Sequence, residues 1–485
     1  MKGRVRYIWS LLLSLLCFGH LSAQEILSAE LVNNVPEFFG QILLDNLGIN
    51  IDLDVGVDVY RVTYSATGSD GQPDIASGLI MLPEVIDGSL PILVYEHGTT
   101  DGSEDVPSNL QGGFQLGLIF AAKNMAVIAP DFLGLGTSRG FHPYVHAPTE
   151  ASASVEMLDA ALPWLVGRDV EWNEQLFITG YSQGGHAAMA THQYIQEQAQ
   201  DRYEVTASLP MSGPYSISGV MRELAFSDEP FNFIAYLVYS TRALKEIYPN
   251  LYGDESEVFK DPYLPAIRAF IESRNGLFDM NEQLVAELIR NVGAPIPREI
   301  FQESILEMIE TDMSHPFNQA LAESDLFDWT PEAPVLMLYC PTDDQVPFIN
   351  SIIADSVMNA NGAVSVSSED VSDGRILDHT DCIVPALNRG IPWLLGFIDT
   401  TTPDITIPIE GLEIYPNPAS GILTIRSPKH ISGATIYDLT GRHLRTRPYN
   451  GENILELDVT GLSSGIYLLE LTGEQLRTLQ KVVIE

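Results

Sequence analysis

Short apolar runs and helix-favouring stretches alternate along most of the chain, from about Val57 to Phe397. The apolar runs have the length of buried strands, and the stretches between them have the length of helices. This alternation is typical of an α/β sheet, here opened by a pair of strands. The predicted strands are Tyr60–Ser65, Ile75–Leu82, Pro91–Glu96, Met125–Pro130, Leu176–Ile178, Val205–Met211, Val335–Tyr339 and Ala363–Val371.

The strand pattern is interrupted once, between Pro214 and about Trp329. Helical periodicity replaces it there, as in the segment from Leu284 to Arg290. We therefore predict a helical insertion over residues 214–329 that forms a cap on the α/β domain. Its aromatic residues are expected to build mainly the core of the cap, with a minority lining a pocket. Examples are Phe231, Phe233, Tyr236 and Tyr239.

The pattern changes again after Phe397. Residues 399–411 have the Thr- and Pro-containing composition of a linker. From Leu412 onward, short alternating strands separated by Gly, Asn and Pro turns predict a small all-β sandwich over residues 412–485. The strands expected there are Ile422–Arg426, Ala434–Tyr437, Ile454–Val459, Gly465–Leu471 and Thr478–Ile484.

Residues 1–23 have the three parts of a secretory signal peptide. Basic residues open the segment, an apolar run covers Tyr7 to Phe18, and Leu21-Ser22-Ala23 suits cleavage before Gln24. The run is shorter than a typical transmembrane span, and no later stretch is long and apolar enough to cross a bilayer. We expect a soluble, secreted chain, extracellular or at the cell surface, whose main domain covers residues 24–398.

The charge of the chain is strongly negative. Asp and Glu number 65 against 25 Lys and Arg, a net charge of −40. Nucleic acid is excluded as a partner because its binding requires a basic surface, and anionic membrane surfaces would be repelled. The charge assigns no substrate, since solubility alone accounts for it.

The most informative chemical motif is Gly180-Tyr-Ser182-Gln-Gly184. It follows the predicted strand that ends at Ile178 and precedes an Ala-rich helical stretch. Strand, G-x-S-x-G and helix together are typical of a nucleophile elbow, a sharp turn that exposes the serine hydroxyl above the sheet. Such short patterns also occur by chance in loops, but the flanking elements favour Ser182 as a nucleophile.

A serine nucleophile needs a base and a carboxylate that orients it. In proteins with a nucleophile elbow, the serine comes first along the chain, the acid second and the histidine last. Asp343 and Asp344 follow a predicted strand, at the sheet edge where such sites assemble. We predict Asp343 as the acid and keep Asp344 as the alternative, while a helix N-cap is the lesser role open to either. Of the three histidines after Asp343, two lie in the β-sandwich region, so His379 is the predicted base.

Two backbone N–H groups are expected to form an oxyanion hole. One belongs to Gln183, directly after the nucleophile, and the other to the loop after the predicted strand Pro91–Glu96. Gly98 lets this loop turn sharply, and Thr99 is the best candidate for the second donor. His97 precedes the nucleophile in the chain and is expected to be structural.

Two cysteines remain after the signal peptide, and they flank the predicted acid and base. Cys340 lies three residues before Asp343, and Cys382 lies three residues after His379. If acid and base meet, the sulfurs meet as well, and an exported chain can form a disulfide. Two free buried thiols are an equally open alternative. No Cys/His spacing indicates zinc, and no metal or cofactor is predicted.

Further motifs accompany the predicted triad: Asp131–Ser138, His142–Tyr144, Ser212–Tyr215 and Asp378–His379. Together with Gly180–Gly184 they resemble the α/β-hydrolase superfamily, and within it the secretory-lipase-like esterases. This resemblance implies ester hydrolysis through an acyl-enzyme, without metal or cofactor. Two departures are Cys340-Pro341, where the acid loop usually has a glycine, and Thr380-Asp381, where small residues usually follow the histidine.

The β-sandwich region carries motifs of its own: Tyr415–Pro418, Asp438–Arg442, Gly465–Tyr467 and Lys481–Glu485. They resemble the C-terminal sorting domain of the type IX secretion system. The resemblance implies export across the outer membrane by that secretion machinery, often with removal of the domain. By pattern alone, the region is a β-sandwich that could equally be a binding module.

The sequence therefore favours a secreted serine carboxylic-ester hydrolase acting on a small-molecule or lipid-like ester. Two other classes stay open. A serine peptidase of the same fold would use the same triad on short peptides. A non-enzymatic adhesin would hold no reactive serine.

Overall fold

The computed structural model describes residues 24–86, 88–398, 411–428, 430–431, 433–437, 443–448, 454–473 and 476–485. The chain divides into two compact units, with the boundary between Ile398 and Asp399. The predicted signal peptide and all but the last residue of the predicted linker lie outside the described residues.

A nine-stranded sheet forms the frame of the larger unit, in the order β1-β2-β3-β5-β4-β6-β7-β8-β9. β1, β2, β3 and β5 are antiparallel neighbours, and each pair from β5 through β4 to β9 is parallel. Every strand predicted between residues 60 and 371 is present. The strands are β1 Ile26–Val35, β2 Val57–Thr67, β3 Pro73–Pro83, β4 Leu90–Glu96, β5 Ala126–Pro130, β6 Trp172–Tyr181, β7 Val205–Met211, β8 Val335–Tyr339 and β9 Val366–Asp370.

The parallel strands end at one edge of the sheet, and the predicted functional residues follow these ends. Thr99 lies after β4, Ser182 after β6, Asp343 after β8 and His379 after β9. The topology therefore gathers at one edge residues that are far apart in the sequence.

β1 and helix α1 (Glu37–Leu47) lie before Tyr60, in a segment where the sequence pattern predicts no element. β1 is an edge strand that pairs with β2 only, and two register shifts interrupt its ladder. None of its residues is fully buried. It therefore lacks both the apolar run and the regular alternation by which a strand is recognised in a sequence.

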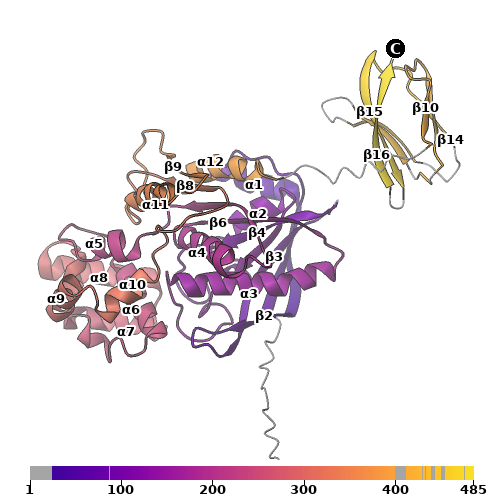
Figure 1. The fold of residues 1–485 in the computed structure, drawn as a ribbon. Helices are drawn as coiled ribbons and strands as arrows, with labels where there is room; N and C mark the ends of the chain where they lie inside the picture. Colours follow the sequence, from indigo (N-terminus) through magenta and orange to yellow (C-terminus); the bar gives the residue numbers. More distant parts are fainter. Residues whose placement is uncertain are drawn as a thin grey trace, which may run out of the picture. The chain divides into compact units, whose positions relative to one another are not determined.

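Helices cover both faces of the sheet. Apolar residues of α1, α2 and α12 form one core cluster with the strands, and those of α3, α4 and α11 pack on the other face. Figure 1 shows α1, α2 and α12 on one side of the strands and α3 on the other. The bounds are α2 Gln115–Ala121, α3 Ala147–Val166, α4 Gln183–Gln198, α11 Ile349–Ala360 and α12 Ile383–Leu395, with a short turn η1 at Pro107–Asn109.

The segment between β7 and β8, residues 212–334, is helical, and we call it the cap. It has an apolar core of its own, with Phe231 and Tyr239 buried in it and Phe233 and Tyr236 packed against it. In Figure 1 its helices form a separate group beside the sheet. The bounds are α5 Arg222–Ala225, α6 Ile234–Ile247, α7 Leu264–Ile271, α8 Leu277–Val292, α9 Glu303–Thr311 and α10 Pro316–Ala322, with short turns at Ile217–Met221, Glu255–Glu257, Asp261–Tyr263 and Pro297–Ile300.

The smaller unit contains two antiparallel sheets, β10-β11-β14 and β13-β12-β15-β16, whose apolar side chains share one core cluster. The five predicted strands are present, and β10 and β13 are additional. β10 is very short, and the sequence of β13, His-Leu-Arg-Thr-Arg-Pro, shows no apolar alternation. The motif Asp438–Arg442 lies outside the described residues. The bounds are β10 Glu413–Tyr415, β11 Ile422–Arg426, β12 Gly433–Tyr437, β13 His443–Pro448, β14 Ile454–Asp458, β15 Gly465–Gly473 and β16 Leu476–Ile484.

Candidate active site

Ser182 occupies the sharp turn between β6 and α4. It is the single residue between the end of β6 at Tyr181 and the start of α4 at Gln183. Its backbone has φ 61° and ψ −123°, a conformation that costs about 1–3 kcal/mol for a residue other than glycine. Such strain persists only where the surrounding structure enforces it, and it is common at functional sites.

The glycines of the motif allow the backbones around this turn to approach closely. A Cβ atom on Gly180 would lie 2.2 Å from the Gly184 carbonyl oxygen, and one on Gly184 would lie 2.1 Å from the Glu96 carbonyl oxygen. A Cβ atom on Gly185 would lie 2.4 Å from the Met211 carbonyl oxygen. The first turn of α4 therefore rests directly on the backbones of β4 and β7, with no room for a side chain.

His379 and Asp343 form a short hydrogen bond, in which Nδ1–H of His379 donates to Oδ2 of Asp343 at 2.6 Å. The Asp343 side chain is only 1% exposed. It also accepts the backbone N–H groups of Gln345 at 2.9 Å and Val346 at 2.8 Å. Asp344 has a different partner, because its carboxylate accepts the backbone N–H of His379 at 3.1 Å. The structure thus places Asp343, and not Asp344, against the imidazole ring.

The second ring nitrogen of His379, Nε2, is buried and has no hydrogen-bond partner among the described residues. Because Nδ1 carries the proton that Asp343 accepts, Nε2 holds the free lone pair. The Tyr181 hydroxyl fixes the same loop by donating to the His379 carbonyl oxygen at 2.6 Å. His379 and Ser182 line one open cavity of about 470 Å³, which we call the outer cleft. Other residues of the outer cleft include Gly98, Thr99, Phe278, Asp344 and Asp378.

The residues of the two predicted oxyanion donors each line a cavity that also contains Ser182, Gln183 the one on the side of the cap and Thr99 the outer cleft. Gln183 is the first residue of α4, so its N–H has no acceptor within the helix and lies at the positive end of the helix dipole. Thr99 lines the outer cleft together with Ser182. A 2.8 Å hydrogen bond between the hydroxyl groups of Thr99 and Tyr144 holds its loop.

His97 is fully buried, and its ring nitrogens contact the backbone carbonyls of Gly98 at 2.7 Å and Asp131 at 3.1 Å. These partners support the structural role predicted for it. The carboxylate of Asp131 in turn accepts the Ser77 hydroxyl at 2.6 Å and the Ser108 N–H at 2.9 Å. Asp131 therefore fixes the loop that follows β5.

Cys340 and Cys382 form a disulfide. This decides between the two possibilities that the sequence leaves open. Because the two cysteines flank Asp343 and His379, the bond ties the loop of the acid to the loop of the histidine.

A buried polar cluster beside the elbow is not predicted from the sequence. Nε2 of Gln183 lies 2.9 Å from Oε1 of Glu150 and 2.8 Å from Nε2 of His142. Oε2 of Glu150 lies 2.6 Å from Nδ1 of His186, whose Nε2 donates to the Ser324 carbonyl oxygen at 3.0 Å. Burial lowers the pKa of His142 to about 4, so its ring is neutral and accepts from Gln183. The cluster anchors the residue that follows the nucleophile.

Glu96, at the end of β4, is a second buried acid without a sequence signal. Its carboxyl group lies 2.9 Å from the Ser154 hydroxyl and 2.8 Å from the Thr191 hydroxyl. Ser154 Oγ is also 3.0 Å from the Glu150 carbonyl oxygen, and its single hydrogen cannot serve both acceptors. If Glu96 is protonated, it can donate to the Ser154 hydroxyl, which then donates to the Glu150 carbonyl oxygen. Burial favours this protonated state, because it raises the pKa of Glu96 to about 8.

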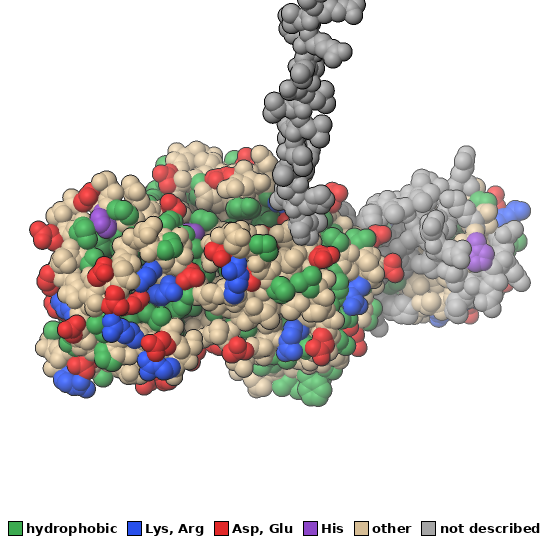
Figure 2. Space-filling model, turned by 90° about the horizontal axis from the view of Figure 1, so that it is seen from below, with side chains coloured by type: hydrophobic (Ala, Val, Ile, Leu, Met, Phe, Trp, Pro, Cys, Tyr) green, Lys and Arg blue, Asp and Glu red, His purple; other side chains and the backbone are tan. Residues whose placement is uncertain are grey.

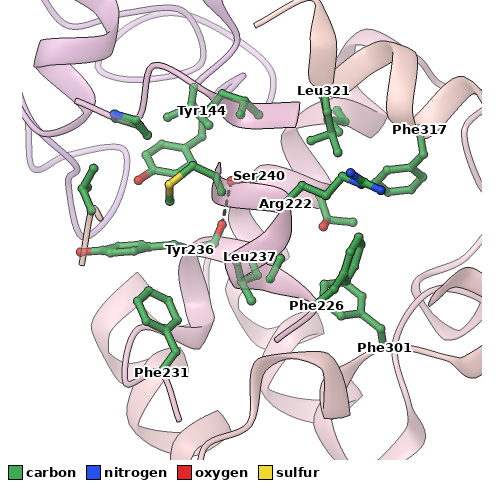
Figure 3. Close-up of a pocket in the computed structure, with 18 of the residues that line it drawn as sticks. Tyr144, Arg222, Phe226, Phe231, Tyr236, Leu237, Ser240, Phe301, Phe317 and Leu321 are labelled. Carbon is green, nitrogen blue, oxygen red and sulfur yellow. Dashed lines mark hydrogen bonds between the residues drawn. The ribbon is translucent and has the colours of Figure 1, made fainter. Parts of the chain in front are cut away.

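A second cavity reaches Ser182 from the side of the cap, and we call it the inner cavity. Its volume is about 100 Å³, and apolar cap residues form most of its wall. Ser182, Tyr236 and Gln345 line both spaces, and the Tyr236 hydroxyl donates to Oε1 of Gln345 at 2.8 Å. This pair therefore stands between the inner cavity and the outer cleft. Figure 3 shows the cap residues around the inner cavity, among them Phe226, Phe231, Leu237, Phe301 and Phe317.

The outer cleft is acidic. Asp344 and Asp378 are exposed and line it, and no Lys or Arg is among the described residues of its wall. On the face shown in Figure 2, Asp and Glu side chains are spread over the surface among fewer Lys and Arg. A negatively charged leaving group would be repelled at this entrance.

Comparisons with known proteins agree with both units. The model of the secretion system C-terminal sorting domain matches residues 413–485. The rice cell wall degrading esterase LipA from Xanthomonas oryzae is 25% identical, with a TM-score of 0.65 over 76% of this chain and 96% of that chain. A protein from Legionella pneumophila named as a hydrolase is 24% identical, with a TM-score of 0.68 over 78% of this chain and 99% of that one.

Candida antarctica lipase A in its closed state shares the fold at 11% identity, with a TM-score of 0.56 over 74% of this chain and 78% of that chain. No curated protein matches the chain by sequence. Both resemblances noted in the sequence are confirmed: the larger unit is an esterase- and lipase-like α/β hydrolase in fold, and the tail resembles a sorting domain that indicates export by type IX secretion.

The described residues contain no helix with the length and apolar character of a membrane span. They also contain no group of three or more His, Cys, Asp or Glu side chains placed to hold a metal ion.

Proposed function

We propose that this chain is an exported carboxylic-ester hydrolase that acts through an acyl-enzyme on Ser182. One observation carries the proposal: the Asp343–His379 hydrogen bond leaves Nε2 of His379 without a partner, in a cleft that also contains the strained Ser182. An ester-cleaving site needs this combination of nucleophile, free base and buried orienting carboxylate.

In the first half of the reaction, Ser182 Oγ attacks the ester carbonyl while Nε2 of His379 takes its proton. The Asp343 carboxylate stabilises the imidazolium that forms. The N–H groups of Gln183 and Thr99 bind the oxyanion, and each such donor is worth about 3 kcal/mol. The tetrahedral intermediate then collapses, and the leaving alkoxide receives the proton from Nε2.

In the second half, water attacks the acyl-enzyme with the same groups in the same roles. His379 takes a proton from the water and returns it to Ser182 Oγ as the carboxylic acid leaves. We assign the acyl group to the inner cavity, because its wall is apolar, and the alcohol to the outer cleft, which opens to solvent. The sorting domain, residues 412–485, would carry the chain to the secretion machinery.

Replacing Ser182 by Ala tests the proposal. Turnover of p-nitrophenyl esters should fall by at least ~10³-fold, and a fluorophosphonate probe should no longer label the folded chain. Undiminished turnover would rule out Ser182 as the nucleophile. Unlabelled wild-type chain would instead favour a non-enzymatic adhesin.

Asp343→Asn and Asp344→Asn form a matched pair for the acid. We expect the first to lower kcat by ~10³–10⁴-fold and the second by less than about tenfold, because only Asp343 contacts the ring. Equal effects would contradict the assignment. A parallel panel of aminoacyl amides separates an esterase from a serine peptidase, since amides require protonation of a poorer leaving group.

A further inference from the structure

Arg222 of α5 lies in the wall of the inner cavity, which also contains Ser182. Figure 3 shows it at the end of the cavity beside Phe317, away from Tyr144 and Tyr236. Tyr236 also lines the outer cleft and marks the end near the nucleophile. Arg222 is therefore a cationic group at the far end of a mainly apolar space.

The lack of an ion pair sets Arg222 apart from the other cations of the cap. Each of the other seven Lys and Arg residues between residues 212 and 334 has a carboxylate oxygen within 3.6 Å. In the part of the chain that the structure describes, Arg222 has no such partner. The sequence holds 65 acidic residues against 25 basic ones, so a missing partner here is not explained by a shortage of carboxylates.

The guanidinium group also has unused hydrogen-bonding capacity. Its Nε is buried and has no partner among the described residues. Nη1 donates to the Ser218 carbonyl oxygen at 3.4 Å, and Nη2 contacts the sulfur of Met313 at 3.7 Å, so both contacts are long. Arg222 as a whole is half-buried, and its contact with Met313 is exposed, so the cost of a missing acceptor falls on the buried Nε. An oxygen acceptor on a bound ligand would relieve that cost.

We propose that Arg222 binds an oxygen-bearing group, a carboxylate or a hydroxyl, at the far end of the substrate's acyl chain. The inference rests on the proposed function, in which the acyl carbonyl lies at Ser182 and the chain extends into the inner cavity. The apolar wall accommodates the methylene groups, and the guanidinium group donates hydrogen bonds to the oxygen at the polar end. The preferred substrates are then esters of ω-hydroxy or ω-carboxy acids rather than of plain fatty acids.

The ω-carboxylate and the ω-hydroxyl group differ in charge, and therefore in how the acidic outer cleft affects their entry. An ω-carboxylate must pass Asp344 and Asp378 of the outer cleft, and added salt should speed its entry by screening the repulsion. An ω-hydroxyl group carries no charge, so the rate with its ester should not depend on salt in this way. The salt dependence therefore distinguishes the two sources of the acceptor oxygen.

The test compares p-nitrophenyl octanoate with the matched ω-hydroxyoctanoate and octanedioate monoesters. The specificity ratio is the kcat/KM of the better ω-oxygen ester divided by the kcat/KM of the octanoate ester. We expect Arg222→Met to lower this ratio by at least about tenfold. Arg222→Lys should lower this ratio less than Arg222→Met does, because lysine keeps the positive charge but lacks the planar set of guanidinium donors. Arg290→Met, which removes an exposed and ion-paired arginine of the same cap, should leave the ratio unchanged.

An unchanged ratio in folded Arg222→Met would overturn the proposal. So would a rise in octanoate turnover alone, which would make Arg222 a plug at the end of the cavity. A binding measurement keeps the inference separate from the proposed function. By calorimetry on a Ser182→Ala background, Arg222→Met should weaken binding of octanedioate monomethyl ester at least about tenfold relative to methyl octanoate, which has no ω-oxygen. If no ester were turned over, the hydrolase proposal would fail while this binding result still decided the role of Arg222.

Discussion

The buried carboxyl group of Glu96 makes the stability of the larger unit depend on pH. Burial raises its pKa from 4.5 to about 8, so the folded chain keeps a proton that the unfolded chain releases. The stabilisation from this group is complete below pH 4.5. It then falls by ~1.4 kcal/mol per pH unit until the folded group ionises.

We expect Glu96→Gln to remove this dependence, because the amide is neutral throughout and keeps the shape of the side chain. The wild type should lose stability relative to the variant as the pH rises from about 5 to about 8. Urea unfolding at several pH values in this window measures the difference. Glu84→Gln, at an exposed position, is the matched control, and parallel profiles for wild type and Glu96→Gln would contradict a protonated Glu96.

Residues with a sequence motif could be placed before the structure, whereas their buried supports could not. Ser182 and His379 follow from the elbow motif and from chain order, and the structure brings both to one cleft. The contacts in the fold, rather than the sequence, distinguish Asp343 from Asp344. Glu96 and Glu150 lack any local signal because their partners lie on other elements, and burial of a polar group depends on tertiary packing.

The packing of α4 on the sheet leaves no room for a side chain at Gly184. A Cβ atom there would lie 2.1 Å from the Glu96 carbonyl oxygen, and backbone on both sides cannot move aside cheaply. We expect Gly184→Ala to destabilise the larger unit by ~1–3 kcal/mol or more and to lower kcat as α4 shifts. Thermal unfolding and ester turnover measure both effects. Gly102→Ala is the control, because nothing lies within 4 Å of its added Cβ, and equal effects would show that the close approach is not needed.

The disulfide between the acid loop and the histidine loop should also be needed for full stability. It closes a loop with a sequence separation of 42 residues, for which the chain-entropy model gives ~4 kcal/mol. We expect reduction to lower the melting temperature and the turnover of the wild type together. The double variant Cys340→Ala/Cys382→Ala should behave like the reduced wild type and should not respond to reductant. If reductant affected the double variant as strongly as the wild type, the loss of stability would not come from the Cys340–Cys382 disulfide.

Elements with a regular pattern were predictable, and irregular ones were not. The buried strands of the sheet appear in the sequence as apolar runs, and the cap is marked by helical periodicity. β1 is interrupted by two register shifts, and β13 carries arginines in place of an apolar alternation. Both strands form by pairing with a neighbouring strand rather than through a strand-like pattern of their own residues. They therefore cannot be predicted from the local sequence.

The whole molecule combines two units with different tasks and very different charge. Most of the net charge of −40 lies outside the tail, on the unit that contains the acidic outer cleft. The number of units and the sandwich character of the tail could be inferred from changes in pattern. The substrate class could not, since it depends on which cap side chains meet at the inner cavity, and helical periodicity does not contain that information.

The larger unit should act as a hydrolase without the tail. Every side chain that lines the inner cavity or the outer cleft belongs to residues 24–398. We therefore expect a chain of residues 24–398 to hydrolyse p-nitrophenyl esters with a kcat/KM within about twofold of the chain that includes the tail. Its melting temperature should match the transition assigned to the larger unit, because the described residues of its core clusters all belong to that unit. A loss beyond about tenfold in a chain with unchanged circular dichroism would mean that residues 399–485 contribute to catalysis. In the producing cell the same deletion should abolish export, because the sorting domain is the part of the chain that indicates type IX secretion.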